Sequence, residues 1–192
     1  MLWTRDSVQD KLRAFGLRPA RSLERQAAVA IVLRLAPEPG VLLIRRSEDD
    51  HDPWSGHMAF PGGRREPEDQ SLLETAVRET REEVGIDLSA SADLAGQLDE
   101  VEAIARGRPV GLVIVPFVFL LRDEAVQASL SDEVDEALWA ALEPLAKGRA
   151  DTRRPYSFEG QTLELPGYRV GEHVVWGLTY RMLSMLFDVI RR

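Results

Sequence analysis

The stretch GRREPEDQSLLETAVRETREEVGI, residues 63–86, predicts one helix behind a glycine turn. Either Asp69 or Ser71 suits the N-cap, because a short polar side chain there accepts a hydrogen bond from a backbone N–H of the first turn. Gly85 suits the left-handed residue that commonly ends a helix. Between these caps, small or apolar residues recur every four positions, as expected of a helix that packs along one face: Leu72, Ala76, Thr80 and Val84.

Three carboxylates lie on this helix beside the apolar stripe: Glu79, Glu82 and Glu83. Offsets of three and four residues share a helix face, so the three side chains fall within an arc of about 100°. Like charges at this spacing repel one another unless a cation lies among them. Hard divalent ions such as Mg²⁺ and Mn²⁺ prefer such oxygen ligands. The segment therefore indicates either a metal site or a solvated acidic face, which is the commoner role of glutamates on a helix.

The composition limits the classes of function. The chain has 192 residues, of which 44% are hydrophobic, as is ordinary for one globular domain. Its formal net charge of -8 argues against a surface that coats nucleic acid, since phosphate backbones are bound by clustered Lys and Arg. It has no cysteine, which excludes disulfides, thiolate zinc sites and cysteine nucleophiles. A bound metal would therefore need oxygen or imidazole ligands.

The sequence predicts no targeting or membrane segment. Residues Met1–Lys11 are too polar for the apolar centre of a signal peptide. The apolar run Val174–Ile190 is interrupted by Arg181 and Asp188, and it is too short and too charged to span a bilayer. We expect a cytoplasmic protein in which this run forms a buried helix.

The rest of the chain alternates strand-like and helix-like patterns. The run Val110–Leu121 is the most apolar, and Pro116 within it suggests an edge strand or a bulge, because proline cannot donate to a sheet ladder. Arg149–Arg169 is typical of a projecting hairpin. The other expected elements are strands at Ala27–Leu35, Val41–Arg46, Leu94–Ile104 and Glu136–Ala140, helices at Asp6–Phe15 and from Leu178, and a helical turn at Leu142–Ala146. This mixture predicts an α+β or α/β sandwich.

Residues Arg78–Ile86, RETREEVGI, resemble the REUxEExGU half of the Nudix box, in which U is an aliphatic residue, and a glycine pair precedes them. Two departures are visible. Thr80 stands at a U position, and the stretch between the glycine pair and Arg78 is one residue longer than the commonest spacing. Asp69 or Glu74 must therefore stand in for the first glutamate of the box.

The resemblance implies a fold and an organisation. The fold class is α/β (α+β), a Nudix-type α/β/α sandwich with a mixed central sheet. Residues 1–192 are expected to form a single Nudix hydrolase domain. Its parts are an N-terminal helix within 1–20, the box loop and helix at 63–86, a hairpin at 149–170 and a C-terminal helix at 178–191.

The same resemblance implies roles for the residues of the box. Glu79, Glu82 and Glu83 would be ligands of one to three Mg²⁺ or Mn²⁺ ions, and the carbonyl of Gly62 would be a further ligand. Arg78 would orient a glutamate. The ions would bridge the carboxylates to a polyphosphate substrate and lower the pKa of the attacking water.

Other titratable residues outside the box are also candidates for a role. In this family the catalytic base often lies outside the box, on a loop after the central strands, and on that analogy Glu133 and Glu136 are candidates. The alternative is that both are solvated acids at the start of a strand or helix. His51 and His57 are expected in structural positions or at the substrate rim, because the acidic triplet already accounts for a hard ion.

Three further stretches resemble the coenzyme A pyrophosphatase branch of this family. They are AAVAI with VLLIRRS (27–31 and 41–47), GHMAFPGG (56–63) and VWGLT (175–179). The chain departs from the branch between Ser47 and Gly56, where EDDHDPW replaces a Leu-Arg-x-His element. The resemblance implies coenzyme A or an acyl-CoA as substrate.

Substrate contacts are expected from two segments. Arg45 and Arg46 end the second strand, and Arg153, Arg154 and Tyr156 lie in the hairpin. A guanidinium fork suits phosphate, and an aromatic ring suits a stacked base. The alternative is a hairpin whose arginines are solvated and whose aromatic residues only pack.

The leading expectation is an enzyme, a Nudix pyrophosphohydrolase acting on acid anhydrides in phosphorus-containing compounds. The alternatives are ADP-ribose, nucleotide sugars or other nucleotides as substrates and, from a different class, a Nudix-fold module that senses a nucleotide without cleaving it. Retention of all three carboxylates favours an enzyme. The expected partner is a small nucleotide, with no nucleic acid coat and no membrane, and a homodimer remains open.

Overall fold

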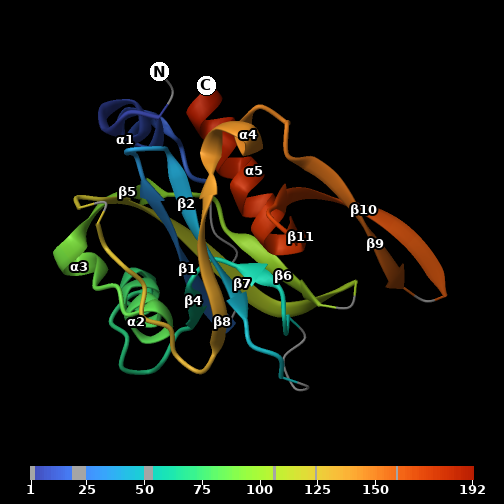
Figure 1. The fold of residues 1–192 in the computed structure, drawn as a ribbon. Helices are drawn as coiled ribbons and strands as arrows, with labels where there is room; N and C mark the ends of the chain where they lie inside the picture. Colours follow the sequence, from blue (N-terminus) through green and yellow to red (C-terminus); the bar gives the residue numbers. More distant parts are fainter. Residues whose placement is uncertain (1–2, 19–24, 50–53, 106, 124, 159) are drawn as a thin grey trace.

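The computed structural model describes residues 3–18, 25–49, 54–105, 107–123, 125–158 and 160–192 (Figure 1). His51 lies outside these residues. The helices are α1 (Arg5–Ala14), α2 (Leu72–Val84), α3 (Leu88–Ser91), α4 (Leu142–Ala146) and α5 (Gly177–Arg191). The strands are β1 (Arg25–Arg34), β2 (Gly40–Arg46), β3 (Met58–Ala59), β4 (Gly62–Arg64), β5 (Ala92–Gln97), β6 (Val101–Ala105), β7 (Arg108–Leu121), β8 (Val134–Ala141), β9 (Asp151–Phe158), β10 (Gln161–Val170) and β11 (His173–Trp176). Within these ranges no helix is both long enough and apolar enough to cross a membrane.

A mixed sheet of eight strands forms the centre of the molecule. Its main order is β3-β2-β1-β7-β5, with β4 beside β1, β6 beside β7, and β8 beside β2. β1 and β7 run parallel, and the other paired strands of this sheet run antiparallel. The mixed α+β architecture predicted from the sequence is therefore confirmed.

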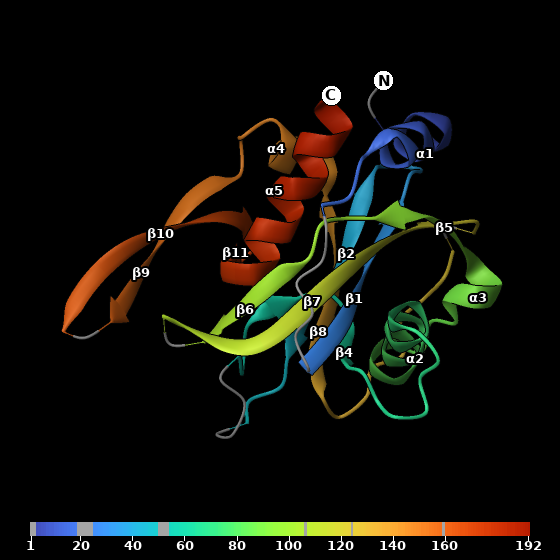
Figure 2. The ribbon, with the colours of Figure 1, turned by 180° about the vertical axis from the view of Figure 1, so that it is seen from behind.

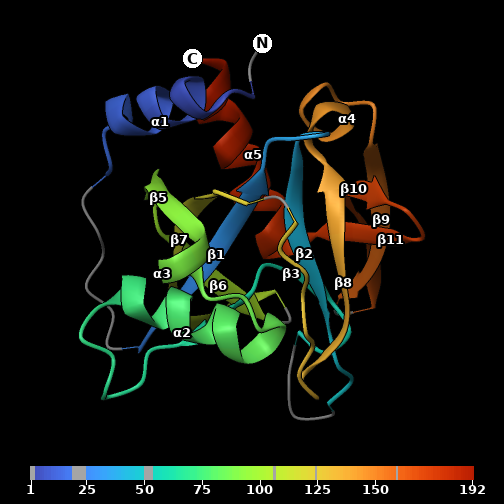
Figure 3. The same ribbon diagram turned by 60° about the vertical axis from the view of Figure 1, so that its left-hand side comes forward.

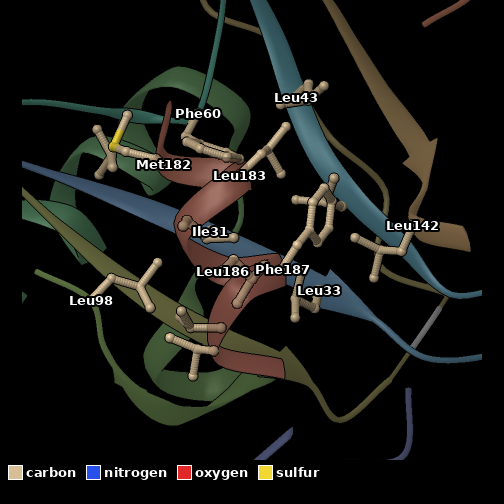
Figure 4. Close-up of a cluster of buried hydrophobic side chains, with 14 of the residues drawn as sticks. Ile31, Leu33, Leu43, Phe60, Leu98, Leu142, Met182, Leu183, Leu186 and Phe187 are labelled. Atoms are coloured by element: carbon tan, nitrogen blue, oxygen red, sulfur yellow. The ribbon is translucent and has the colours of Figure 1, made fainter. Parts of the chain in front are cut away.

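Alternation along β1 sends side chains to both faces of this sheet. Ile31 and Leu33 belong to the cluster that packs under α1 and α5, and Ala28, Ala30 and Val32 belong to the cluster that packs under α2. Figures 2 and 3 show α2 on one side of the sheet and α1 and α5 on the other. Figure 4 shows the larger cluster, in which one face of α5 packs on the sheet with the side chains of Met182, Leu183, Leu186 and Phe187.

Short side chains separate α2 from the sheet. Ala28 and Ala30 on β1 and Ala76 on α2 are all 0% exposed and lie in one cluster. Because an alanine adds only one carbon to the backbone, the helix axis lies close to β1. This close packing sets the height of the helix above the glycine pair on β4.

Two sequence expectations about the strands are wrong. The segment Leu94–Ile104 is not one strand, because β5 and β6 pair with successive parts of β7. Pro116 does not mark an edge, since β7 lies between β1 and these two strands. Pro116 lies where the strand paired with β7 changes from β5 to β6. Its carbonyl accepts from the N–H of Leu98, in the connection between β5 and β6, at 3.0 Å. A proline without an N–H is accommodated at that junction.

A second sheet of three strands, β9, β10 and β11, carries the predicted hairpin. β9 and β10 project from the body of the molecule in Figure 1, and β11 returns to α5. On β9, Arg154 and Tyr156 share one face by alternation, whereas Arg153 lies on the other. This sheet adjoins the segment that leads into β3, because the ring of His57 lies 4.8 Å from that of Trp176 on β11.

Candidate active site

The caps of α2 fix both of its ends. Ser71 is the N-cap residue, and its side chain accepts from the backbone N–H of Glu74 at 3.2 Å. Gly85 ends the helix in the left-handed conformation, with φ 69°, as predicted. The carbonyls of Val84 and Glu83 accept from Ser129 and Ser131 at 2.8 and 3.0 Å. The acidic end of the helix is therefore anchored to the segment that leads into β8.

The glycine pair allows the helix carboxylates to approach β4. Gly62 has φ 152°, and a β-carbon there would collide with the backbone of Ala28 and Val29. A β-carbon at Gly63 would overlap the carboxylate of Glu79. Only glycine leaves room for the strand and the carboxylate together.

Glu83 is the most deeply buried carboxylate of the predicted triplet, with 3% of the residue exposed. Its Oε2 accepts from the backbone N–H of Gly62 at 2.8 Å, and its Oε1 lies 3.5 Å from Nη1 of Arg46. Burial raises the pKa of Glu83 to about 7, because the partial compensation from Gly62 and Arg46 is smaller than the cost of removing the charge from water. The charges of Glu79 and Glu133 add to this rise.

Arg78 connects the acidic residues of the box. Its Nε and Nη2 each donate to the carboxylate of Asp69 at 3.0 Å, and its Nη1 donates to Glu79 at 3.1 Å and to Glu82 at 2.9 Å. This bidentate pairing holds the pKa of Asp69 well below its usual range. Of the two stand-ins left open by the sequence, Asp69 faces Arg78, whereas Glu74 accepts from the N–H of Gln70 at 2.7 Å.

Thr80 stands at the position where the Nudix box has an aliphatic residue. It is fully buried, and its hydroxyl donates to the carbonyl of Ala76 at 2.7 Å. A buried hydroxyl with a partner costs little. This departure from the box therefore leaves the packing of α2 intact.

The three glutamates differ in exposure and partners. The side chain of Glu79 is 16% exposed and that of Glu82 is 59% exposed, and both are bound to Arg78. Within the described residues, no three Asp, Glu or His side chains lie in an arrangement that could hold a metal ion. Arg78 donates to one oxygen of Glu79 and one of Glu82, and Gly62 donates to one oxygen of Glu83.

The donor set nevertheless fits a hard divalent cation. Burial is the largest cause that raises the pKa of both Glu79 and Glu83, and repulsion from Glu133 acts on both. Carboxylates with partly uncompensated charge in a site that excludes water favour a cation beside them. Carboxylate oxygens are also the ligands that Mg²⁺ and Mn²⁺ prefer.

The structure separates the two candidate bases. Glu133 precedes β8, and its charge acts on both Glu79 and Glu83. Glu136 pairs directly with Arg45 on β2, and its Oε2 lies 2.8 Å from Nε2 of His173 on β11. The side chain of Glu136, on β8 of the central sheet, therefore contacts the three-stranded sheet at His173 rather than the carboxylates of α2.

The predicted substrate contacts also lie in separate surroundings. Arg46 lies beside Glu83, whereas Arg45 lies 3.4 Å from both Glu48 and Asp135. In the hairpin, the Arg154 guanidinium lies 4.7 Å from the ring centre of Trp176.

Tyr156 lies with Arg154, since its ring centre is 5.4 Å from that of Trp176. Sequence reasoning did not assign a role to Trp176 or to His173. Trp176 lies in the VWGLT stretch, which the sequence did single out. No sequence pattern, however, indicates that its ring contacts His57, Tyr156 and Arg154.

We expect the stability of the metal-free protein to fall as pH rises from about 4.5 to about 7. The unfolded chain releases the Glu83 proton near its ordinary pKa of 4.5 and the folded protein near 7, so the native state binds more protons across that window. The stabilisation is complete below the lower value and is lost at the upper one, on the order of 3 kcal/mol. Urea unfolding in chelator at several pH values measures it.

Glu83→Gln is the control for this pH dependence, because an amide does not titrate. Asp69 acts in a different window, since its lowered pKa contributes stability that is lost only as pH falls below about 4. An equally steep loss between pH 4.5 and 7 in Glu83→Gln would show that another group is responsible.

Comparisons with known proteins agree with this geometry. A model of the NUDIX domain matches residues 24–159. An uncharacterized protein of Schizosaccharomyces pombe is 44% identical over 117 residues, which are 60% of this chain and 36% of that protein. A protein of Pectobacterium atrosepticum named Uncharacterized Nudix hydrolase NudL is 33% identical over 175 residues, which are 88% of this chain and 84% of that one.

The solved structures show the same fold. The MutT protein from Methanosarcina mazei Go1 has a TM-score of 0.55 and 25% identity, covering 89% of this chain and 99% of that one. The chain spans only 36% of the length of the S. pombe protein and 52% of that of a NudL from Yersinia enterocolitica.

Proposed function

The chain belongs to the NUDIX family, and on that premise we propose that it is a metal-dependent pyrophosphohydrolase of a nucleoside diphosphate derivative. The observation that carries the proposal is the Glu83 carboxylate, which is buried against the Gly62 N–H beside Glu79. A buried charge without a full partner is costly in a purely structural position. The same charge is useful where a cation and a polyphosphate have to be held.

The roles proposed for the box residues follow from their positions. Glu79, Glu82 and Glu83, with the carbonyl of Gly62, would hold Mg²⁺ or Mn²⁺. Such an ion neutralises the charge of the phosphate oxygens and makes water a stronger nucleophile at neutral pH. Arg78 positions Glu79 and Glu82.

A proton acceptor is also needed, because the attacking water loses a proton. Of the two predicted bases, Glu133 is supported by its electrostatic coupling to Glu79 and Glu83. Glu136 is less suited, because His173 occupies one of its oxygens.

For the substrate we propose coenzyme A or an acyl-CoA, on the resemblance of three stretches to the coenzyme A pyrophosphatase branch. The test is a product assay with Mg²⁺ and with Mn²⁺ on coenzyme A, ADP-ribose and nucleotide sugars. Coenzyme A should yield adenosine 3′,5′-bisphosphate and phosphopantetheine. Good turnover of ADP-ribose without turnover of coenzyme A would show that ADP-ribose, and not coenzyme A, is the substrate. Binding of nucleotides without any turnover would indicate a sensing module.

Addition of Mg²⁺ or Mn²⁺ should stabilise the protein. A ligand that binds only the native state at 100 times its Kd adds about 2.7 kcal/mol, because stabilisation follows RT ln(1 + [L]/Kd). For a domain of this size that corresponds to a rise in melting temperature of about 5 to 10 °C. Thermal unfolding with chelator and with several millimolar metal measures the shift.

Two variants show whether the stabilisation comes from the proposed ligands. Glu83→Gln removes a ligand, whereas Glu143→Gln removes the same charge from an exposed ion pair on α4. The shift should survive in Glu143→Gln and shrink in Glu83→Gln. An equal shift in both variants would mean that the cation acts on the overall charge of the chain, and would contradict the site.

A further inference from the structure

A second candidate site lies beside the segment that leads into β3. A cavity of about 190 Å³ opens between the three-stranded sheet and the segment before β3. The residues that give it chemical character are His57, Arg154, Glu172, His173 and Trp176.

Two stretches singled out in the sequence meet at this cavity. The GHMAFPGG stretch contributes His57 and Met58, and the VWGLT stretch contributes Trp176. The hydroxyl of Thr179 donates to the carbonyl of Met58 at 2.9 Å, and the rings of His57 and Trp176 lie 4.8 Å apart. The stretch that leads into the glycine pair is therefore fixed to the start of α5 at the wall of the cavity.

The polar groups of the cavity are held in place by neighbours. The Arg154 guanidinium lies over the Trp176 ring, and Tyr156 packs on the same ring. A guanidinium stacked in this way keeps N–H donors available at its edge. Nε2 of His173 is bonded to Glu136 at 2.8 Å, which fixes the orientation of the imidazole. Glu172, the acid of the lining, is exposed on the turn between β10 and β11.

The size and donors of the cavity limit what it can hold. Sites for whole small molecules usually measure about 300 Å³ or more, so a cavity of about 190 Å³ suits one group of a ligand. The guanidinium of Arg154 provides several N–H donors, which match the oxygens of a phosphate monoester. The indicated ligand group is therefore a single phosphate.

The cavity is within reach of the carboxylate cluster. Met58 lines it, and Gly62, four residues later, donates to Glu83. An extended chain rises about 3.3 Å per residue, so Met58 at the cavity and Gly62 beside Glu83 are at most about 13 Å apart along this segment. One nucleotide can therefore place its pyrophosphate at α2 and another phosphate in the cavity.

We propose that this cavity binds a phosphomonoester of the substrate, remote from the pyrophosphate that is cleaved, and so selects nucleotides that carry a third phosphate on the ribose. The inference rests on the proposed function and deepens it. Arg154 supplies the charge and the N–H donors of the site, and Trp176 positions Arg154.

Calorimetric titration with adenosine 3′,5′-bisphosphate and with 5′-AMP tests the proposal without any turnover. The wild type should bind the bisphosphate about tenfold or more tightly than AMP, as one charged hydrogen-bonded contact can provide. Arg154→Gln should remove this preference. Arg153→Gln should keep it, because Arg153 is the neighbouring arginine on the opposite face of β9 and has the same charge.

Three outcomes would overturn the assignment. The first is equal binding of the two nucleotides by the wild type. The second is an equal loss of AMP and bisphosphate affinity in Arg154→Gln, which would indicate a base-binding cavity. The third is loss of the preference in Arg64→Gln instead, because Arg64 lines a different basic cavity of about 380 Å³ with Arg25 and Arg65.

Kinetics separate this proposal from the proposed function. If coenzyme A is hydrolysed, Arg154→Gln should lower kcat/KM for coenzyme A about tenfold more than that for dephospho-coenzyme A, mainly through KM. Arg153→Gln, at the neighbouring arginine on the opposite face of β9, should not change the ratio of the two kcat/KM values. If coenzyme A is not hydrolysed, the proposed substrate fails, while the titration still decides whether the cavity binds a phosphomonoester.

Discussion

Glu83→Gln is expected to lower kcat by roughly 10² to 10³-fold, the range seen when one group that stabilises developing charge is removed. The amide keeps the volume of the side chain and can still accept from the Gly62 N–H, so the position of β4 should not change. It lacks the charge that would hold a divalent ion. Initial rates on the best substrate at saturating metal measure the loss.

The fold of this variant should be retained or stabilised near neutral pH. A buried amide with a hydrogen-bond partner costs less than a buried carboxylate whose charge is only partly compensated. Glu143→Gln serves as the matched change at an exposed position. If Glu83→Gln kept about half of the wild-type activity, Glu83 would not be a ligand of the catalytic metal.

Asp69→Asn is expected to destabilise the protein by about 3 kcal/mol, since removal of one partner of a buried ion pair leaves the other charge uncompensated. Asp69 is 4% exposed and accepts from Arg78, from the hydroxyl of Thr75 at 2.8 Å and from the N–H of Glu66 at 2.9 Å. An asparagine cannot accept on both sides at once. The free energy of unfolding in urea measures the change.

Asp93→Asn is the control for this substitution. Asp93 is bound to two arginines, Arg5 and Arg122, but its side chain is 39% exposed. Exposed pairs are worth about 1 kcal/mol or less. Similar losses in the two variants would show that burial of the Asp69 pair does not matter, contrary to the expectation.

Local features of the sequence predicted the helix α2 and its C-cap at Gly85. Helical periodicity and the requirement for a left-handed residue at Gly85 depend on neighbours within one or two turns, and these are visible in the sequence. The separation of β5 from β6 depends on how they pair with β7, and an apolar run does not reveal a change of partner. For the same reason the sequence did not show that the strand carrying Pro116 lies inside the sheet rather than at its edge.

The sequence did not predict the contacts between segments that are distant along the chain. Glu133 and Glu136 are three residues apart and looked equivalent, but strand pairing and a bulge at Arg45 and Arg46 place Glu136 beside His173 on another sheet. Arg153 and Arg154 also looked equivalent until the position of Trp176 distinguished them. Such differences arise from strand register, where a shift of one residue reverses the face.

Substitutions of the alanines between α2 and β1 are expected to change the position of the proposed metal-binding carboxylates. Ala28, Ala30 and Ala76 carry no reactive group, yet they determine how far the carboxylates stand from the glycine pair. A displacement of about 1 Å can cost a factor of about 100 in rate. Larger apolar residues at these positions could preserve a folded, soluble chain while disabling its chemistry. If the proposed function is correct, substitutions in this part of the core are restricted by the alignment of the carboxylates as much as by stability.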